Sequence, residues 1–260
     1  MIIDTHMHVW SMKDVDYYFD VPIEQYMQDN KINKTALIAI SEKENAEVRK
    51  IVNERGSEFF GIGYVNHRNM DASLKQLEKD VKDGLVRGIK LYPYSEHFML
   101  DSDEINPIYE KCLELDIPVL LHVGWQRSSL VHPSQVGAAP CKYSTLGFPV
   151  QFGTVLEKYP KLKMIMAHMG ADSYFQCLGI CLRFENAYLD TAWLQYYAER
   201  LFPQVTVKEW IEHAVKYLGS EKILYGGEGT LPKDILETDI KESEKEDILY
   251  KNAAKLYKLN

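Results

Sequence analysis

Eight short runs of apolar, β-branched and aromatic residues recur along this chain of 260 residues, and polar stretches with helical periodicity separate them. This alternation predicts strands and helices in turn, and parallel strands need a crossover between them. Eight such units in about 250 residues are typical of a closed (β/α)8 TIM barrel. No Gly-x-Gly-x-x-Gly follows the first run, which disfavours an open dinucleotide-binding sheet. The predicted strands are Ile2–His8, Thr35–Ile40, Phe59–Val65, Val86–Tyr92, Pro118–Val123, Leu162–His168, Ala187–Asp190 and Lys222–Gly226.

Helix signals lie between these runs. Glu209 stands three residues after Thr206, a capping box that predicts a helix start, and Gly219 is suited to end the same helix. No linker, repeat or composition break interrupts residues 1–260, so a single domain is expected. The longest segment without a pattern, about 124–147, is expected to be a loop on the substrate side. Apolar stripes at helical spacing are Leu74, Leu77 and Val81, and Trp210, Ile211, Ala214, Val215 and Leu218.

Composition restricts the partners. The chain has 38 acidic and 30 basic residues, a formal net charge of −8, which disfavours a nucleic-acid binder because phosphates require a basic face. No apolar run approaches the roughly 18 residues of a membrane span, and the first residues do not resemble a signal peptide. The four cysteines form no Cys-x-x-Cys pair and are expected to be reduced. A cytoplasmic protein without a membrane partner is predicted, and a homo-oligomer is left open.

The eight histidines are distributed unevenly. Seven of them lie at or just beyond the carboxyl ends of predicted strands, and only His213 falls inside a predicted helix. In a barrel these ends share one rim, where barrel enzymes keep their active sites. His6 and His8 are two residues apart, so they share one side of the first strand. His122 and His168 end the fifth and sixth strands.

Glu228 follows the eighth predicted strand and adds a carboxylate to this rim. Imidazole and carboxylate groups are ligands of Zn²⁺ and related divalent ions, so the pattern predicts a metal site. An apolar stack is expected beneath the His168 ring, because Leu162, Met164 and Met166 share its parity along the strand.

Five further residues are candidates for supporting roles. Asp4 has the parity of the first-strand histidines and either orients a ligand or bonds backbone near the strand start. Asp190 is a similar candidate, or a plain strand-end acid. Trp125, Arg127 and Trp193 are candidate substrate contacts, because Arg binds carboxylates and Trp offers a flat apolar wall; ordinary loop packing is the alternative.

Together these motifs resemble the amidohydrolase superfamily, specifically its amidohydrolase-2 branch of metal-dependent hydrolases and decarboxylases. The resemblance runs through the whole chain. It is carried by Ile3-Asp4-Thr5-His6-Met7-His8-Val9-Trp10, Arg87-Gly88-Ile89-Lys90-Leu91-Tyr92-Pro93, His122, His168-Met169-Gly170, Asn186-Ala187-Tyr188-Leu189-Asp190-Thr191 and Ile223-Leu224-Tyr225-Gly226-Gly227-Glu228.

The resemblance implies a ligand set. His6, His8 and His122 would hold one divalent metal, and the acid of the eighth strand would complete the shell. Zn²⁺ is expected first, with Mn²⁺ or another divalent ion as alternatives and no second metal. His168 would lie near the activated water or the substrate.

Two positions are ambiguous under this resemblance. The eighth strand normally ends in Asp, whereas Glu228 is a methylene longer. It could ligate the metal, act only as a base, belong to a changed function, or pair with a nearby Lys or Arg. Lys90 is expected to be an uncarboxylated cation near the substrate. In some superfamily members this lysine is carboxylated and bridges two metals. A third possibility is that Lys90 only snorkels from the end of its strand to solvent.

The first functional hypothesis is metal-dependent hydrolysis of an amide, lactone or other carboxylic ester, with Glu228 and His168 moving the proton. The substrate is expected to be a small carboxylate-bearing molecule, drawn to Lys90, Arg127 and the metal despite the acidic surface. Non-oxidative decarboxylation of an unsaturated or aromatic acid is the alternative on the same site. A catalytically inactive metal-binding barrel and a metal-dependent phosphoesterase are the remaining hypotheses.

Overall fold

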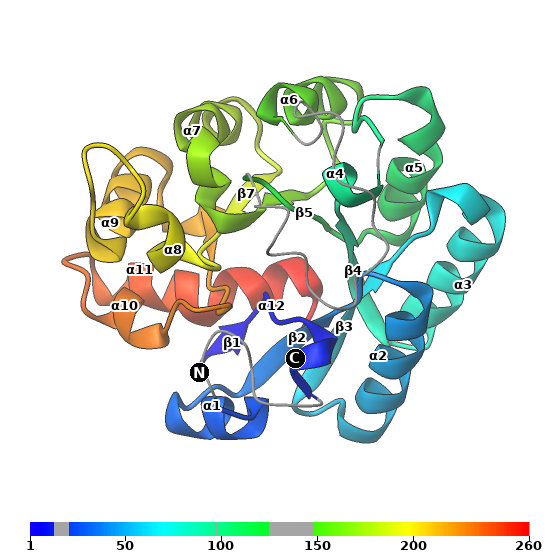
Figure 1. The fold of residues 1–260 in the computed structure, drawn as a ribbon, viewed down its shortest axis with the longest axis horizontal. Helices are drawn as coiled ribbons and strands as arrows, with labels where there is room; N and C mark the ends of the chain where they lie inside the picture. The colour runs from blue at the N-terminus through cyan, green and yellow to red at the C-terminus, as the bar shows by residue number, and fades with distance from the viewer. Residues whose placement is uncertain (13–20, 97, 125–147, 260) are drawn as a thin grey trace.

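A computed structural model describes residues 1–12, 21–96, 98–124 and 148–259. Eight parallel strands form one sheet in chain order and curl into a barrel with helices outside it (Figure 1), which confirms the predicted TIM-barrel fold. The residues that directly follow the first and last strands meet where Thr5 N donates to Tyr225 O over 2.9 Å. The strands are β1 Ile3–Asp4, β2 Lys34–Ile38, β3 Phe59–Tyr64, β4 Val86–Leu91, β5 Val119–Leu121, β6 Met164–Met166, β7 Ala187–Asp190 and β8 Ile223–Leu224.

The predicted helix signals are borne out. Thr206 and Glu209 form a complete capping box at the start of α9, and Gly219 follows its last residue with a left-handed φ of 83°. Leu77 of the predicted stripe is buried in α3. The α-helices are α1 Ile23–Asp29, α2 Glu42–Arg55, α3 Met70–Lys82, α4 Pro93–Glu96, α5 Asn106–Leu115, α6 Pro149–Lys158, α7 Tyr174–Arg183, α8 Leu194–Ala198, α9 Val207–Leu218, α10 Pro232–Leu236, α11 Glu242–Glu246 and α12 Asn252–Tyr257.

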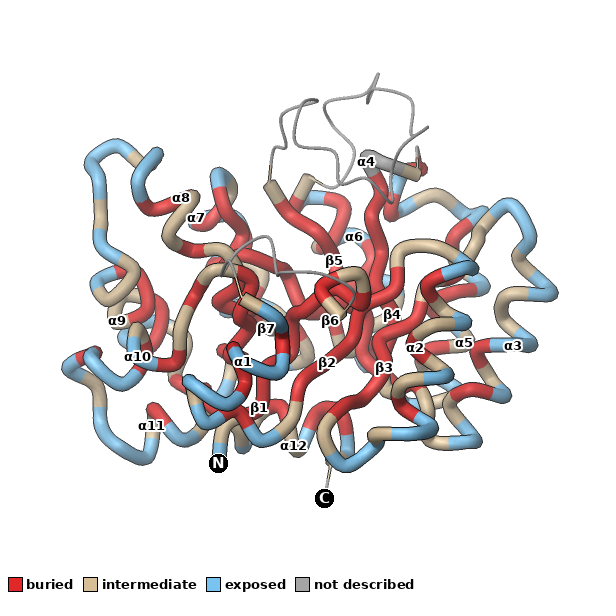
Figure 2. Tube along the Cα trace, turned by 60° about the horizontal axis from the view of Figure 1, so that its bottom comes forward, coloured by how far each residue is buried: buried red, intermediate tan, exposed pale blue. Residues whose placement is uncertain are grey.

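Apolar side chains form two clusters, one between strands and helices and one inside the barrel. Alternation along each strand separates them, so that Leu120 joins the inner cluster while Val119 and Leu121 join the outer one. Tyr257 of α12 packs inside, with its ring centroid 5.1 Å from that of Phe60. Figure 2 shows α12 at the end of the barrel opposite α4, which follows β4. The C-terminal helix therefore fills one end and leaves the carboxyl ends of the strands to form the other.

The first predicted strand is shorter than expected. Regular pairing ends at Asp4, and His8 makes only an isolated bridge with Ile38. The cause is local, because the Asp4 carboxylate accepts the backbone N–H of His6 over 2.9 Å and takes that group out of the ladder.

The expected apolar stack beneath His168 is wrong. Ile165 and Ala167 face the barrel interior, whereas Met164 and Met166 belong to the outer cluster. Strand β6 ends at Met166, and His168 has a left-handed φ of 59°. This turn breaks the two-residue alternation, so the His168 ring reaches the interior despite its parity.

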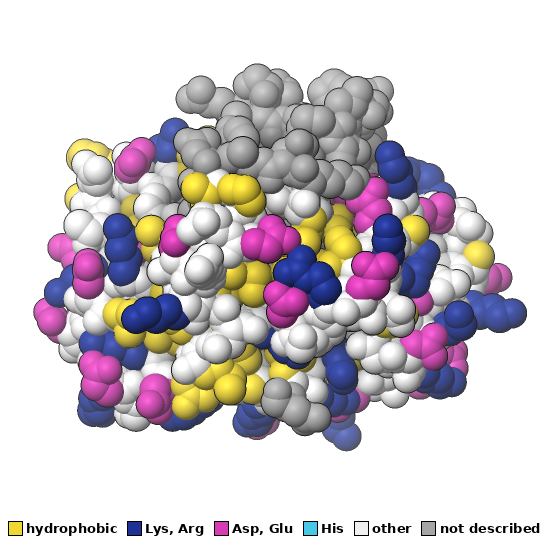
Figure 3. Space-filling model, turned by 90° about the horizontal axis from the view of Figure 1, so that it is seen from below, with side chains coloured by type: hydrophobic (Ala, Val, Ile, Leu, Met, Phe, Trp, Pro, Cys, Tyr) yellow, Lys and Arg dark blue, Asp and Glu magenta, His cyan; other side chains and the backbone are white. Residues whose placement is uncertain are grey.

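Most of the predicted loop lies outside the described residues, as do Trp125 and Arg127. Among the residues that are described, no helix is both long and apolar enough to span a membrane. Figure 3 shows acidic and basic side chains interspersed over one face of the molecule.

Candidate metal centre

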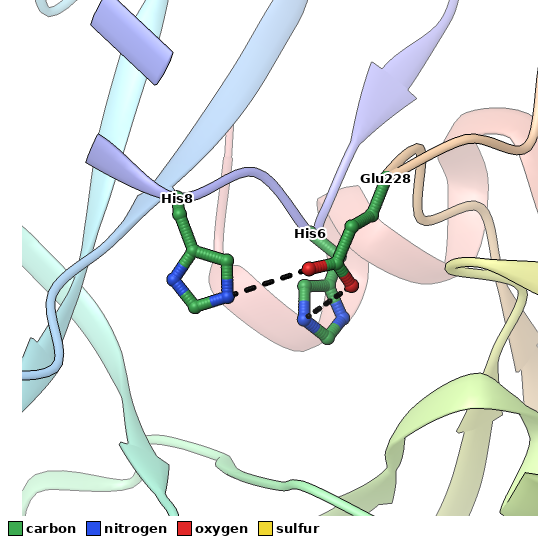
Figure 4. Close-up of side chains that lie close together, drawn as sticks. All are labelled: His6, His8 and Glu228. Carbon is green, nitrogen blue, oxygen red and sulfur yellow. Dashed lines mark ion pairs between the residues drawn. The ribbon is translucent and has the colours of Figure 1, made fainter. Parts of the chain in front are cut away.

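Three buried donors meet at the carboxyl ends of the first and last strands. Ligand atoms of His6, His8 and Glu228 all lie within 4.8 Å of one another (Figure 4). One carboxylate oxygen of Glu228 is 3.4 Å from Nε2 of His6, and the other is 3.5 Å from Nε2 of His8. Two imidazoles and a carboxylate that converge in this way suit a divalent metal ion.

The His6 ring is oriented by Asp190 at the end of β7. Nδ1 of His6 lies 2.7 Å from the Asp190 carboxylate, which places the proton on Nδ1 and directs the Nε2 lone pair toward Glu228. Burial holds the pKa of His6 well below its ordinary value, and the charge of Lys90 lowers it further. The ring is therefore neutral near pH 7, as a metal ligand must be.

Asp4 holds backbone rather than an imidazole ring, the second of the two roles considered from the sequence. Its Oδ1 accepts the N–H of His6 over 2.9 Å and that of Gly227 over 2.8 Å. Its Oδ2 accepts the hydroxyl of Tyr26 over 3.0 Å. Burial raises the pKa of Asp4 to about 7, while these donors oppose that rise. Asp4 thus ties together the two segments that carry His6 and Glu228.

Glu228 reaches the imidazoles from an unusual backbone conformation. Its φ is 45°, in the left-handed region that L-residues adopt at some cost. The preceding Gly227 fixes this turn, because its N–H donates to Asp4 and its carbonyl accepts the N–H of Trp193 over 3.3 Å. From this backbone the longer Glu side chain places one oxygen against each histidine.

The other two histidines form a pair beside these donors. Nε2 of His168 is 3.2 Å from Nδ1 of His122, and Nδ1 of His168 is 2.9 Å from the carbonyl oxygen of Ala192. Burial lowers the pKa of His168 to about 3 and holds that of His122 well below its ordinary value. Three of the four predicted ligands are therefore brought together, while His122 lies against His168.

Lys90 is buried among these groups, with 2% of its surface exposed, so it does not snorkel to solvent. Its Nζ is 3.0 Å from Nε2 of His6, the atom directed toward Glu228. Burial lowers the pKa of Lys90 to about 8, although Glu228 and Asp190 favour its charged form. A metal ion on His6 would use the lone pair to which Lys90 donates here.

Aromatic rings surround the histidines. The Trp10 ring stacks on His8 with centroids 5.4 Å apart, and the Tyr92 ring centroid lies 4.3 Å from that of His122. The predicted Trp193 lies 6.3 Å from His168 by ring centroids. Trp10 and Tyr92 belong to the motifs quoted from the sequence but were not named as site candidates, although each follows a candidate residue by two positions. Tyr197, 5.7 Å from His168, lies on a helix that carried no such signal.

The fold and these donor residues define the class of protein: a TIM barrel with a candidate metal centre at its mouth. Residues 3–259 match the family model described as amidohydrolase. The chain belongs to the amidohydrolase family, as its motifs predicted.

A curated relative and two solved structures resemble the chain. 2-Amino-3-carboxymuconate-6-semialdehyde decarboxylase of Dictyostelium discoideum is 25% identical over 232 residues, which cover 80% of this chain and 64% of that protein. An uncharacterized TIM-barrel protein from Bordetella bronchiseptica has a TM-score of 0.72 at 16% identity, with 99% of this chain and 98% of that chain covered. 5-Carboxyvanillate decarboxylase from Novosphingobium aromaticivorans, with bound manganese, has a TM-score of 0.70 at 14% identity, with 100% of this chain and 97% of that chain covered. These structural likenesses show the fold.

Proposed function

We propose that the protein is a metal-dependent decarboxylase that removes CO₂ without oxidation from a small unsaturated or aromatic carboxylic acid. The observation that supports this proposal most directly is that ligand atoms of His6, His8 and Glu228 converge within 4.8 Å, beside a buried lysine and aromatic rings. Two of the similar proteins are decarboxylases of such acids, which supports this choice. The order of the two main sequence hypotheses is therefore reversed, and hydrolysis becomes the alternative.

His6, His8 and Glu228 are the proposed holders of one divalent ion. Such an ion supplies a Lewis-acidic centre for a substrate oxygen. Zn²⁺ was expected first from the sequence, but the similar carboxyvanillate decarboxylase carries manganese. Mixed imidazole and carboxylate donors accept both ions, so Mn²⁺ is proposed beside Zn²⁺.

The surrounding residues suit an anionic conjugated substrate. The Lys90 ammonium lies in the interior, where it offsets the charge of a bound carboxylate more strongly than it would in water. The rings of Tyr92 and Trp193 offer flat walls to a planar acid. Lys90 is thus proposed as a charge-compensating residue and Trp193 as a substrate contact.

Decarboxylation requires one proton at the carbon that loses CO₂. The carbon–carbon bond breaks, its electron pair remains on the substrate carbon, and a proton replaces the carboxylate there. His168 and Glu228 are the candidates for this transfer, because they are neighbours at the mouth: Nδ1 of His168, which donates to the Ala192 carbonyl oxygen, lies 3.8 Å from the Glu228 carboxylate. His168 is neutral near pH 7, so it would pass a proton without carrying a lasting charge. We assign proton transfer to this pair.

Release of labelled CO₂ tests the proposal. Protein loaded with Mn²⁺ or Zn²⁺ is incubated with carboxyl-¹³C benzoates, vanillates and dienoic acids, and with lactones, anilides and an aryl phosphate. We expect ¹³CO₂ from at least one acid and, in D₂O, one deuterium in the product. His168→Ala should reduce this release by about a hundredfold or more while metal content is retained.

The other outcomes identify the alternatives. Opening of a lactone or anilide without CO₂ release would establish the hydrolase. Turnover of the aryl phosphate would establish a phosphoesterase, and full metal content without any turnover would support an inactive barrel. The hypothesis of an inactive barrel rested on the presence of Glu228 in place of Asp. In the structure, however, the Glu228 carboxylate reaches both His6 and His8.

A further inference from the structure

Tyr197 of α8 carries a hydroxyl that nothing in the site described so far uses. The residue is 2% exposed, and within the described part of the chain this hydroxyl has no hydrogen-bond partner. Buried hydroxyls are almost always bonded, because an unsatisfied polar group retains its desolvation cost. A buried donor of this kind points to a ligand that supplies the acceptor.

The hydroxyl lies at the mouth of the barrel. A Cβ at Gly124, just beyond β5, would be only 2.7 Å from it, so the absence of a side chain at Gly124 makes room for the phenol. The Tyr197 ring centroid is 5.7 Å from that of His168 and also 5.7 Å from that of Trp193. Residues beyond β5, β6 and β7 thus surround it.

The electrostatic surroundings keep this group a donor. Burial raises the pKa of Tyr197 far above its ordinary value, and the negative charges of Asp172 and Glu228 act in the same direction. The phenol stays protonated at any working pH and offers a proton to a negatively charged acceptor. It does not compete with the histidines for metal, because a protonated phenol is a poor ligand.

We propose that the Tyr197 hydroxyl donates a hydrogen bond to the carboxylate of the bound substrate and selects for an acid over an uncharged analogue. This inference rests on the proposed function and adds a specificity residue to it. The carboxylate loses its negative charge as it becomes CO₂, so the bond favours the bound acid more than the transition state. Tyr197 should therefore contribute to affinity and not to turnover.

Binding to the Tyr197→Phe variant tests this role. The Mn²⁺-loaded protein is titrated calorimetrically with 4-hydroxy-3-methoxy-5-nitrobenzoic acid, with 2,6-dihydroxybenzoic acid and with the carboxamide of each. We expect acid binding to weaken by about tenfold or more, because a hydrogen bond to a charged group is lost, while amide binding changes little. Where an acid is turned over, KM should rise and kcat should be unchanged or higher.

The matched control is Tyr257→Phe, which removes another buried hydroxyl that has no hydrogen-bond partner among the described residues. Tyr257 is the last residue of α12, the helix at the other end of the barrel. It should leave acid binding unchanged. Tyr197→Phe should melt at or above the wild-type temperature, since no hydrogen bond is broken.

The outcomes separate the two proposals. Unchanged acid binding in Tyr197→Phe, equal weakening of acid and amide, or failure of the metal-loaded wild type to bind either acid would overturn the role of Tyr197. Selective weakening of an acid that is bound but never decarboxylated would support Tyr197 and refute the decarboxylase.

Discussion

At the scale of single residues, the Asp190 carboxylate prepares His6 for a metal. Its Oδ2 accepts from His6 Nδ1, while Oδ1 accepts the backbone N–H groups of His168 and Ala192 over 2.8 and 3.1 Å. One buried carboxylate therefore orients a candidate ligand and secures the segment that carries a candidate proton carrier. Metal-ligating histidines in general depend on such a partner.

Replacement of this carboxylate should weaken metal binding. We expect Asp190→Asn to lower Mn²⁺ and Zn²⁺ affinity by about 10–100-fold, because the amide keeps the shape but not the charge that supports His6. Competition titration with a chelating dye measures this. Asp239→Asn, at an exposed position, is the control. Unchanged affinity in Asp190→Asn would argue against His6 as a ligand.

The length of Glu228 should also matter. We expect Glu228→Asp to bind metal more weakly, because a carboxylate one methylene shorter cannot lie between His6 and His8 from the same backbone. Asp tolerates the left-handed region at least as well as Glu, so backbone strain does not explain a loss. Glu228→Gln keeps the length and tests the charge separately. Equal or tighter binding by Glu228→Asp would show that the extra methylene is not required.

At the scale of elements, the seam between β1 and β8 positions the three donors, because His6 and His8 follow β1 and Glu228 follows β8. The hydroxyl of Tyr26 in α1 forms hydrogen bonds with the Asp4 carboxylate over 3.0 Å and with the Tyr225 hydroxyl over 2.7 Å. These bonds attach the seam to the helix layer. A Cβ at Gly227 would stand 2.6 Å from the Tyr26 hydroxyl and closer still to the Asp4 carboxylate. The seam therefore has no room for a side chain at that position.

Gly227→Ala should destabilise the fold through this contact. We expect the free energy of unfolding to fall by about 1–3 kcal/mol, the usual cost of overpacking. Gly153→Ala in α6 is the matched control, because a Cβ there meets nothing within 4 Å; it should be neutral or stabilising by up to about 1 kcal/mol. Urea denaturation of both variants measures the difference. A Gly227→Ala protein as stable as the wild type would show that the seam can relax.

The elements were largely predictable, whereas their ends were not. Apolar runs located all eight strands, because a buried parallel strand needs little else. The run through His8 was read as one strand, since periodicity cannot show that the Asp4 side chain captures a backbone N–H. The left-handed turn at His168 was also hidden, because His168 and Met169, neither of them a glycine, adopt it before Gly170.

At the scale of the whole molecule, barrel closure brings residues from both ends of the chain into one centre. This explains why His6, His8 and Glu228 could be assigned to one rim from sequence. Ring orientations could not be assigned, because the contact between His122 and His168 depends on hydrogen bonds across different strands. The Tyr197 hydroxyl escaped notice because it comes from a helix beyond β7 and not from a strand end.

Metal removal should lower the stability of the whole barrel. An ion that binds only the folded state stabilises it by about 2.7 kcal/mol at one hundred times its Kd. We therefore expect EDTA to lower the melting temperature of the metal-loaded wild type, measured by calorimetry, and Mn²⁺ or Zn²⁺ to restore it. His6→Ala should melt at one temperature with or without metal. If EDTA left the melting temperature of the fully metal-loaded wild type unchanged, this link between metal binding and stability would be contradicted.

Anomalous diffraction from crystals grown with Mn²⁺ tests the central assignment most directly. We expect one anomalous peak at the mouth, about 2.0–2.3 Å from Nε2 of His6, Nε2 of His8 and a carboxylate oxygen of Glu228. Lys90 should then have left Nε2 of His6. Absence of a peak in manganese-replete crystals, or a peak elsewhere with His6 and His8 turned away from Glu228, would contradict the proposed centre.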